Sequence, residues 1–400
     1  MNTMRDQSKQ TGKFISRRKK IIFTLITCLF VFACVDTLFY VFLNKLKRNH
    51  NVFHEDRRVN QRVIDAFYEN YFHADWGWDI PKPKRGALGN RTGQTYGQQE
   101  TYKIKTFGDS FVYGFRLADE ETFQSCVEQK SGWSCLNYGV DGFGTDQAFL
   151  KYQENRVPSQ YTILGILDEN IARVVATWWS FYSFRDVNNI VGTKPRFIVQ
   201  NDKFVLSPNP IGSYQDLQKL HNADFIETLK DKDYWPYYHW QTNAPPHLRW
   251  PAMATLLPHL NFFVRNVIAM YKNRFAPTYE SETSRRRFYH LYRQHPEALK
   301  IMKYIIREFV HTAQQRGEIP IILIFPIKDS MQIIKTYRKK PYQELVSYLQ
   351  HMSYNFIDFG DVFLQEDHKS LYFKNDFHLS AKGNERVADE LIRYIKELEF

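Results

Sequence analysis

The stretch that decides the fold is Ile104–Gly114, which reads Ile-Lys-Thr-Phe-Gly-Asp-Ser-Phe-Val-Tyr-Gly. Its first part predicts a short buried strand, Gly-Asp-Ser predicts a tight turn, and the residues downstream favour a helix. A serine at the carboxyl end of a parallel strand points into the crevice where open α/β sheets bind their ligands. The helix that follows can offer backbone N–H groups to a developing negative charge. Gly-Asp-Ser is also an ordinary turn sequence, so a catalytic role for Ser110 requires partners elsewhere in the chain.

Candidate partners lie near the other end of the chain, in Asn375–Asn384. This stretch places Asp376 two residues before His378, just ahead of a predicted helix. A serine nucleophile needs a base within hydrogen-bond reach, and the base needs an acid that fixes its tautomer. A single loop histidine often has no catalytic role, but this pair lies at a strand-to-helix junction, where the sites of α/β proteins form. The chain order Ser110, Asp376, His378 is therefore compatible with a catalytic triad.

These stretches resemble the SGNH hydrolase superfamily, also called GDSL-type esterases. Gly108–Phe111 matches the first block of the family, and Asp376 with His378 matches the last, although the family more often has the acid three residues before the histidine. The resemblance implies an α/β fold of the flavodoxin-like type, a three-layer α/β/α sandwich with a parallel sheet. It also implies that Ser110 is the nucleophile, His378 its base and Asp376 the acid that orients the base.

Two further blocks resemble the parts of the family that bind the oxyanion. Asn137–Gln147 is similar to the second block, in which a glycine amide donates, and Gly142 is the best match. Leu164–Ile171 is similar to the third block, in which an asparagine side chain donates, which implies Asn170. The family usually has aspartate after this asparagine, whereas this chain has isoleucine. With the amide of Ser110, these groups are the expected oxyanion hole.

From residue 102 onward the chain alternates between strand and helix patterns, which predicts a parallel sheet. The expected strands are Ile104–Phe107, Cys135–Tyr138, Thr162–Ile166, Ile319–Ile324 and Asn355–Ile357. Apolar residues three and four apart predict a helix over Pro296–Gln315 and a last helix capped by Ser380. The family resemblance covers roughly residues 100–180 and 300–400.

An apolar run, Ile21–Leu43, follows a basic leader of residues 1–20. The run is long enough for the ~20 residues that a membrane-spanning helix needs. Asp36 interrupts it towards the far end, where a carboxylate is tolerated better than at mid-membrane. The leading flank carries more Lys and Arg than the residues behind the run, so we expect a single transmembrane signal anchor in the cell membrane, with the remainder periplasmic or extracellular. A cleavable signal peptide and a lipoprotein box ending at Cys34 are the alternatives.

The rest of the chain divides into a lead-in and one large domain. We expect residues 44–100 to form a juxtamembrane lead-in and residues 101–400 to form the hydrolase-like domain, with an insertion at about 178–294. Within the insertion, Lys194–Leu206 favours a hairpin with Asn-Asp at its turn. Tyr234–Trp240 is dense in aromatic residues, which suit a cap over the crevice and equally an ordinary packed surface.

Composition narrows the possible partners. The formal net charge of +11 suits anionic membranes or acidic glycans. No nucleic-acid motif accompanies the charge, so we expect no nucleic-acid partner. No Cys/His cluster has ligand spacing, so we expect neither a metal nor another cofactor. Cys28 and Cys34 lie in the apolar run, whereas Cys126 and Cys135 lie outside it, where an oxidising compartment would permit a disulfide between them.

The function that these features favour is an extracytoplasmic serine hydrolase that cleaves an ester, most simply an O-acyl or O-acetyl ester. The ester is carried by a small molecule, a glycan or a lipid. An O-acyltransferase that modifies an extracytoplasmic polysaccharide is an alternative, because the same triad serves both reactions. A non-catalytic glycan-binding or assembly subunit on the same fold is a further alternative, against which the intact Ser110, Asp376 and His378 argue. Protein partners and the oligomeric state stay open.

Overall fold

The computed structural model describes residues 16–50, 58–93, 100–182, 191–233, 248–275, 278–279, 288–293 and 295–399. The chain divides into two compact units. The first, which we call the helical unit, contains Met1–Glu55 and Thr242–Tyr271. The second, the sheet unit, contains Asp56–Gln241 and Lys272–Phe400. Residues from Asp56 onward in the expected lead-in therefore cluster with the sheet unit, and part of the expected insertion clusters with the apolar N-terminal helix.

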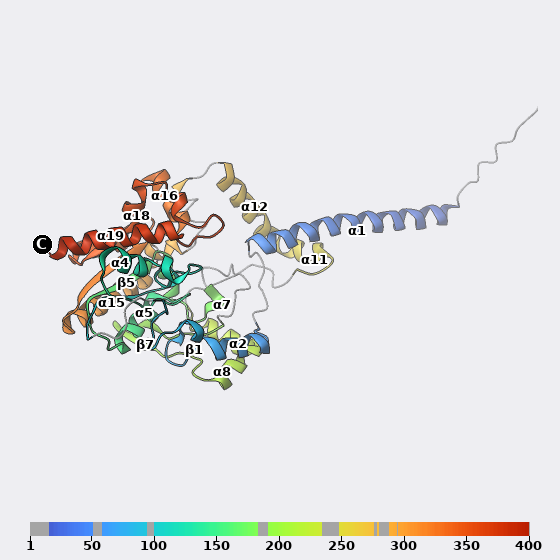
Figure 1. Ribbon diagram of the computed structural model, residues 1–400. Coiled ribbons are helices and arrows are strands. Elements are labelled where there is room, and N and C mark those ends of the chain that lie inside the picture. Colours follow the sequence, from blue (N-terminus) through green and yellow to red (C-terminus); the bar gives the residue numbers. More distant parts are fainter. Residues whose placement is uncertain are drawn as a thin grey trace, which may run out of the picture. The chain divides into compact units, whose positions relative to one another are not determined.

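The sheet unit is built on one parallel sheet of five strands, with β3 next to its edge (Figure 1). The strands, in their spatial order, are β4 (Cys135–Asn137), β3 (Tyr102–Phe107), β5 (Ser159–Leu167), β8 (Ile319–Phe325) and β9 (Phe356–Asp358). All four neighbouring pairs are parallel. Numbered along the chain, this order is 2-1-3-4-5, the flavodoxin-like order. The predicted fold class is confirmed, and each expected strand is present with ends shifted by no more than a few residues.

Helices cover both faces of this sheet, which explains why its strands are almost continuously buried. α4 (Phe123–Ser131) and α19 (Ala381–Glu399) pack together on one face, and α5 (Thr145–Glu154), α15 (Pro296–Gln315) and α17 (Gln343–His351) pack on the other (Figure 1). α15 has the bounds that its apolar periodicity predicts, with Pro296 at its first position. The unit is therefore a three-layer α/β/α sandwich.

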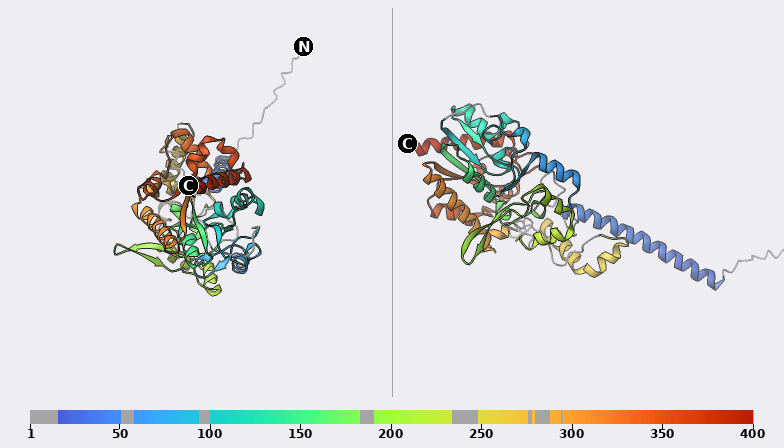
Figure 2. Two further views of the ribbon diagram at one scale, coloured as in Figure 1. Left: turned by 60° about the vertical axis from the view of Figure 1, so that its left-hand side comes forward. Right: turned by 90° about the horizontal axis from the view of Figure 1, so that it is seen from below.

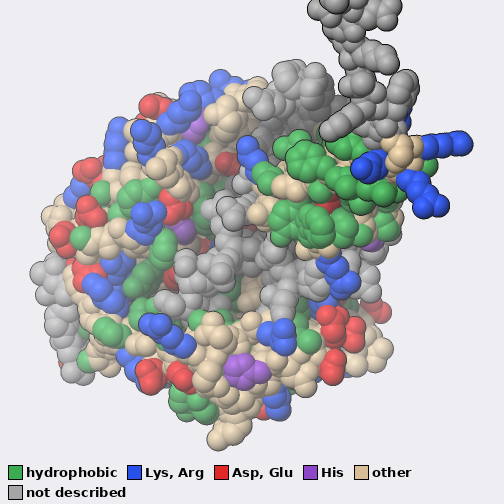
Figure 3. All heavy atoms as spheres, turned by 90° about the vertical axis from the view of Figure 1, so that its right-hand side faces the viewer, with side chains coloured by type: hydrophobic (Ala, Val, Ile, Leu, Met, Phe, Trp, Pro, Cys, Tyr) green, Lys and Arg blue, Asp and Glu red, His purple; other side chains and the backbone are tan. Residues whose placement is uncertain are grey.

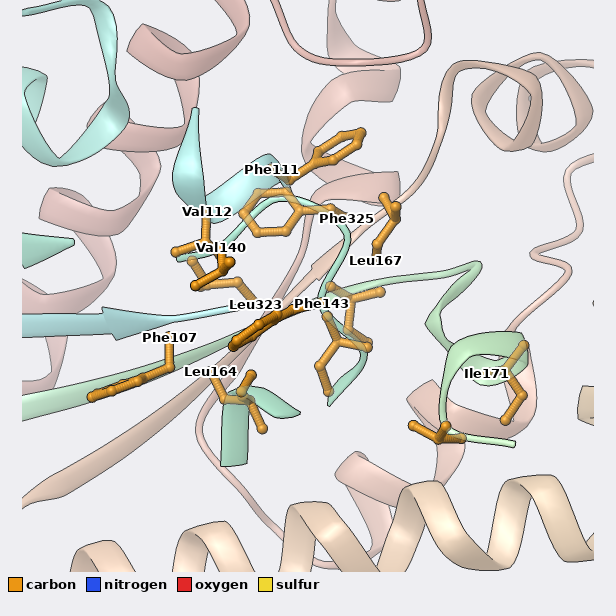
Figure 4. Packing of buried hydrophobic residues seen from close by; sticks show 14 of the residues in the cluster. Phe107, Phe111, Val112, Val140, Phe143, Leu164, Leu167, Ile171, Leu323 and Phe325 are labelled. Atoms are coloured by element: carbon orange, nitrogen blue, oxygen red, sulfur yellow. The ribbon is translucent and has the colours of Figure 1, made fainter. Parts of the chain in front are cut away.

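Close packing under the first turn fixes the short helix α3 (Ser110–Tyr113) on the sheet (Figure 4). The side chain of Val112 is fully buried between two glycines, Gly108 and Gly165. A Cβ atom added to Gly165 would lie 2.3 Å from Cγ2 of Val112, and one added to Gly108 would lie 2.4 Å from the same atom. Larger residues at either glycine would push α3 away from the strands.

The expected hairpin in the insertion is confirmed. β6 (Arg196–Gln200) and β7 (Lys203–Ser207) pair antiparallel and project outward from the sheet unit (Figure 2). The turn residues Asn201 and Asp202 have φ values of 50° and 57°, as the two central residues of a type I′ turn require. Phe204 stacks on Tyr304 of α15 with ring centroids 4.2 Å apart. Residues 234–240, the aromatic stretch, lie outside the described residues.

Residues 58–93 are bound to the sheet unit by aromatic packing. α2 (Gln61–Asn70), β1 (Phe72–His73) and β2 (Gly77–Trp78) form a small subdomain there. The side chain of Trp78 is buried, and its Nε1–H donates to the backbone oxygen of Asp141 at 2.9 Å. This tryptophan therefore packs against the turn that follows β4.

The helical unit is organised around α1 (Arg17–His50). Within the described residues, its part Arg17–Lys45 is the one helix long and apolar enough to cross a membrane. Two further helices of the unit, α11 (Ala252–Leu256) and α12 (Leu260–Phe275), follow each other in the chain, and α11 packs against α1. Asp36, the acidic residue inside the apolar run, is fully buried.

The disulfide considered between Cys126 and Cys135 is not formed, since both are free thiols. Cys126 lies on α4, half-buried and near the charged side chains of Lys130, Glu385 and Asp389. Cys135 begins β4 and is completely buried, and burial raises the pKa of its thiol well above the ordinary value. The two side chains face different neighbours, and Cys135 behaves as a small core residue.

Candidate active site

Ser110 lies where the sequence places it, at the carboxyl end of a central strand. β3 ends at Phe107, Gly108 and Asp109 make the turn, and Ser110 is the first residue of α3. Asp109 caps this helix, because its side chain accepts a hydrogen bond from the amide of Phe111 at 2.8 Å. The Ser110 side chain is buried, which holds its hydroxyl in a fixed environment.

His378 is within hydrogen-bond distance of both expected partners. Its Nε2 lies 2.9 Å from Oγ of Ser110, and its Nδ1 lies 2.8 Å from Oδ1 of Asp376. A carboxylate can only accept, so Nδ1 carries the ring hydrogen and donates it to Asp376. Nε2 is then unprotonated and accepts the hydroxyl hydrogen of Ser110. The structure thus brings together three residues that the sequence predicts as a triad.

Asp376 is held as a carboxylate by several donors. The amide of Phe377 donates to its Oδ1 at 2.6 Å, and Arg116 forms an ion pair with its Oδ2 at 3.0 Å. Burial alone would raise the pKa of Asp376, but the hydrogen bonds from His378 and Arg116 outweigh it and hold the pKa well below the ordinary value. Asp376 therefore stays ionised at any pH at which the protein is expected to work.

Three phenylalanine rings surround the imidazole of His378. The ring centroids of Phe377, Phe115 and Phe111 lie 4.2, 4.7 and 5.5 Å from that of His378. Only 7% of the His378 surface is exposed. The rings restrict the imidazole to the orientation in which it bridges the acid and the nucleophile.

Asn170, the asparagine expected in the oxyanion hole, lies beside the nucleophile turn. It follows β5 and begins the short helix α6 (Asn170–Arg173). Its Nδ2 donates to Oδ2 of Asp109 at 2.8 Å, which engages one of the two amide hydrogens. Its Oδ1 is buried and has no hydrogen-bond partner. Asp109, next to Ser110 in the chain, thus orients the Asn170 amide at the site.

Gly142, the other expected oxyanion donor, lies in the turn after β4 with a φ of 77°. The preceding residue is Asp141. Burial raises the pKa of its carboxyl group, whose charge is close enough to interact with His378 and Arg173. The structure therefore places a carboxyl group next to the expected oxyanion donor, a feature that the sequence did not indicate.

The two acidic residues before Asn170 have structural partners. Oδ1 of Asp168 accepts from the amide of Ile327 at 3.2 Å, and Oδ2 accepts from the hydroxyl of Ser330. Glu169 forms a buried ion pair with Arg173. Both carboxylates are thereby tied to neighbouring elements, which leaves the amide of Asn170 as the neutral donor at the end of this strand.

A small hollow opens next to Gly142. It is lined by Trp78, Gly142, Arg173, Ala176, Trp178, Trp179 and Lys194. Indole rings form much of its wall, and the two cations are held by buried ion pairs, Arg173 with Glu169 and Lys194 with Asp146. Within the part of the chain that the structure describes, no group of three or more His, Cys, Asp or Glu side chains is placed to hold a metal ion.

Ser110 connects the topology of the sheet with the candidate site. The sheet has the flavodoxin-like strand order, and Ser110 lies at the carboxyl end of β3 within reach of a histidine that follows β9. The sheet unit has a flavodoxin-like three-layer α/β/α fold. The fold that the SGNH resemblance implies is therefore confirmed.

Comparisons with known proteins give only distant similarities. No family model and no curated protein matches the sequence. Among solved structures, a member of the G-D-S-L lipolytic family from Veillonella parvula is 10% identical, with 73% of this chain and 96% of that chain covered and a TM-score of 0.34. A lipase/acylhydrolase from Enterococcus faecalis is 11% identical (74% and 96% covered, TM-score 0.35). An acetylxylan esterase from Geobacillus stearothermophilus is also 11% identical (75% and 95% covered, TM-score 0.34).

Two residues of this candidate site were missed by sequence reasoning. Arg116 adopts a left-handed φ of 66° in the loop after α3, and nothing near it in the sequence points to Asp376. Asp141 stands beside the expected Gly142 but has no counterpart in the motif that identified it. Only the Asp-Gly pair, a common turn signal, marked its position.

Proposed function

We propose that this protein is a serine esterase that cleaves an O-acyl ester through Ser110, His378 and Asp376. The observation that carries the proposal is the continuous hydrogen-bonded chain from Oγ of Ser110 through His378 to Asp376, with distances of 2.9 and 2.8 Å. Nucleophile activation requires this geometry. A purely binding role would not require the three residues to be aligned in this way.

The reaction follows from the hydrogen positions. Oγ of Ser110 attacks the ester carbonyl while its hydrogen passes to Nε2 of His378, and Asp376 stabilises the resulting imidazolium. The imidazolium then gives that hydrogen to the leaving alcohol as the acyl–oxygen bond breaks. Water attacks the acyl-enzyme with His378 as base, which releases the acid and restores the hydroxyl of Ser110. The amides of Ser110 and Gly142 and the side chain of Asn170 are the proposed donors to the oxyanion.

We propose that the substrate is an O-acyl ester, most simply an O-acetyl ester, carried by a glycan, a small molecule or a lipid. The hollow beside Gly142 is lined by neither Ser110 nor His378, so the proposal rests on the geometry of these two residues with Asp376.

The proposed location is the outer side of a membrane. α1 begins with Arg17, Arg18, Lys19 and Lys20, and this basic end of the helix is expected to stay in the cytoplasm. A carboxyl-terminal alkaline phosphatase fusion should then be active, and a carboxyl-terminal green fluorescent protein fusion exported by the same route should be dark. The reverse pattern would place the sheet unit in the cytoplasm.

The full chain in detergent tests the chemistry. Ser110→Ala should abolish both labelling by a fluorophosphonate and hydrolysis of an aryl acetate, with an unchanged thermal unfolding curve. Ser347→Ala is the matched control, because Ser347 is exposed on α17. Substantial turnover by a well-folded Ser110→Ala protein would refute the assignment.

Adding an acceptor to the same assay separates hydrolysis from transfer. With an acetyl donor present, hydrolysis releases acetate, whereas an acyltransferase acetylates an added polysaccharide and releases little acetate. Failure of both reactions, with no fluorophosphonate labelling, would leave only the binding role on the same fold.

A further inference from the structure

Asp36 is an ionisable residue inside the apolar run, and the structure gives it defined partners within the helical unit. Its Oδ2 accepts from the amide of Ala252 at 2.7 Å, and its Oδ1 accepts from the amide of Met253 at 2.8 Å. These are the first two residues of α11. Helix-terminal amides lack intrahelical acceptors, so one buried carboxylate satisfies two of them. A residue more than two hundred positions away along the chain thus caps α11.

Apolar packing continues this contact along one face of α1. Asp36, Tyr40 and Leu43 are four and three residues apart, so they lie on the same side of the helix. Leu43 is buried in a cluster with Ala252, Phe262 and Phe263, against which Tyr40, Leu248 and Leu256 also pack. α11 and the beginning of α12 are therefore held against α1 by the two hydrogen bonds to Asp36 and by a small apolar core.

The outward side of the docked segment is also apolar. Its exposed large hydrophobic side chains are Trp250, Leu257, Leu260, Val264, Val267 and Ile268, with between 41% and 63% of their surface accessible. Figure 3, which faces the side of the molecule towards which α1 projects in Figure 1, shows a patch of hydrophobic side chains with Lys and Arg side chains beside it. A patch of this extent marks a contact with another apolar phase or surface.

The position of Asp36 along α1 fixes the depth of this segment. At 1.5 Å per residue, the 16 residues from Lys20 to Asp36 span ~24 Å, compared with a hydrocarbon thickness of ~30 Å. If Lys20 marks the cytoplasmic boundary, Asp36 lies in the outer leaflet. The first amides of α11 must lie at the same depth, because they are hydrogen-bonded to it.

We propose that α11 and the first half of α12 lie in the outer leaflet beside α1, with lipid acyl chains as the occupant of their outward face. The inference rests on the proposed membrane anchor, and it adds a second membrane contact that comes from the middle of the chain. Arg265 is the one Lys, Arg, Asp or Glu in residues 250–268. Its long stem lets the guanidinium reach the phosphate layer while the carbon chain stays in the apolar region.

The contact between Asp36 and α11 also argues against cleavage of the N-terminal segment. Cleavage after the apolar run would remove Asp36 and leave the first amides of α11 without their acceptor. It would also uncover Phe262 and Phe263. The packing of α11 and the beginning of α12 on α1 therefore requires that α1 remain part of the mature protein.

Site-specific photocrosslinking of the full chain in phosphatidylethanolamine–phosphatidylglycerol vesicles tests the proposal. A benzoylphenylalanine replaces Leu257, Val264, Leu29 or Val205 in separate samples, and lipid adducts are measured by mass spectrometry. Leu29 is exposed on α1 and reports on the anchor itself. Val205 is exposed on the hairpin of the sheet unit and is the negative control. We expect adducts at Leu257, Val264 and Leu29, and none at Val205.

The four positions separate the possible failures. Adducts at Leu29 without adducts at Leu257 and Val264 would overturn this inference and leave the anchor intact. No adduct at Leu29 would overturn the anchor, and this inference with it. Crosslinks from Val264 to a second protein chain instead of lipid would assign the face to a protein partner and also overturn the inference.

Two substitutions at neighbouring positions of α1 test the contribution of the Asp36 hydrogen bonds. Asp36→Ala removes both hydrogen bonds to α11 and should lower the yield of lipid adducts at Val264 by at least about tenfold, the change expected from the loss of even one hydrogen bond to a charged group. Thr37→Ala should leave the yield unchanged, because the Thr37 hydroxyl bonds only within α1, to the backbone oxygen of Ala33. Equal yields in both variants would show that the segment reaches the lipid without Asp36.

Discussion

At the residue scale, the proposed chemistry needs neutral donors among several carboxylates. Asp109, Asp141, Asp168 and Glu169 all lie at or near the carboxyl ends of β3, β4 and β5, yet an oxyanion requires hydrogen-bond donors. Asp109, Asp168 and Glu169 each have a hydrogen-bond or ion-pair partner. Nδ2 of Asn170 donates to Asp109 at 2.8 Å and keeps a second amide hydrogen for the proposed oxyanion.

Asn170→Ala should therefore lower kcat by ~10²–10³, about 3–4 kcal/mol, with little change in KM, as the loss of one oxyanion donor does elsewhere. Asn170→Asp should be at least as damaging, because it points a second carboxylate at Asp109. Kinetics of the two purified variants with an aryl acetate would decide this. A near-normal kcat in Asn170→Ala would mean that the donor lies elsewhere.

The ionisation of Asp141 should make the free energy of unfolding depend on pH. Burial raises the pKa of its carboxyl group in the folded protein, so the folded state binds a proton more readily than the unfolded state. Its ionisation consequently destabilises the fold above the folded pKa, and this penalty disappears below the ordinary pKa of an aspartate. Asp141→Asn should raise the free energy of unfolding at pH 7, with the difference shrinking towards pH 4.

Urea titrations of the two proteins at both pH values would measure that difference. Asp231→Asn is a suitable control, since Asp231 is an exposed acid elsewhere in the sheet unit. A gain at pH 7 that persists unchanged at pH 4 would contradict the assigned cause.

At the scale of elements, the nucleophile is placed by the fit of α3 on the sheet. Val112 occupies the space that two glycines leave, so the helix carrying Ser110 rests directly on β5. Sequence patterns predicted the strands and α15 well, because buried parallel strands and amphipathic helices have strong periodic signals. Nothing periodic marks Gly165 as a packing partner of Val112, so this contact was not predictable.

Gly165→Ala should destabilise the protein by ~1–3 kcal/mol through overpacking against Val112. Adding Val112→Ala should recover part of that loss, because it removes the atom that a Cβ at Gly165 would meet at 2.3 Å. Thermal unfolding of the two single variants and the double variant gives the coupling energy.

Gly108→Ala supplies the matched comparison. A Cβ at Gly108 would also meet the backbone oxygen of Gly165 at 2.9 Å, which Val112→Ala does not remove. Rescue should therefore be weaker in the Gly108→Ala, Val112→Ala pair. Equal rescue in the two pairs would argue against Val112 as the obstacle.

For the whole molecule, the contacts hardest to foresee join residues that are far apart in sequence. The proximity of Ser110, His378 and Asp376 was predictable because the two stretches that contain them carry recognisable motifs. The contact of Asp36 with α11 was not, since a lone carboxylate in an apolar run contains no information about where its partner lies. Arg116 is similar, because a single arginine in a loop does not indicate that it binds Asp376.

The distance along the chain between the proposed nucleophile and its proposed base has a consequence for biosynthesis. Ser110 and His378 are 268 residues apart, so the hydroxyl leaves the ribosome long before the imidazole that is proposed to activate it. We therefore expect the growing polypeptide to be inert towards esters during translation and export, whichever compartment its first half has reached. Ribosome-stalled chains ending before Asp376 should not react with a fluorophosphonate, whereas chains stalled on a linker beyond the last helix should. Reaction of the shorter chains would show that Ser110 is activated by a group encoded earlier.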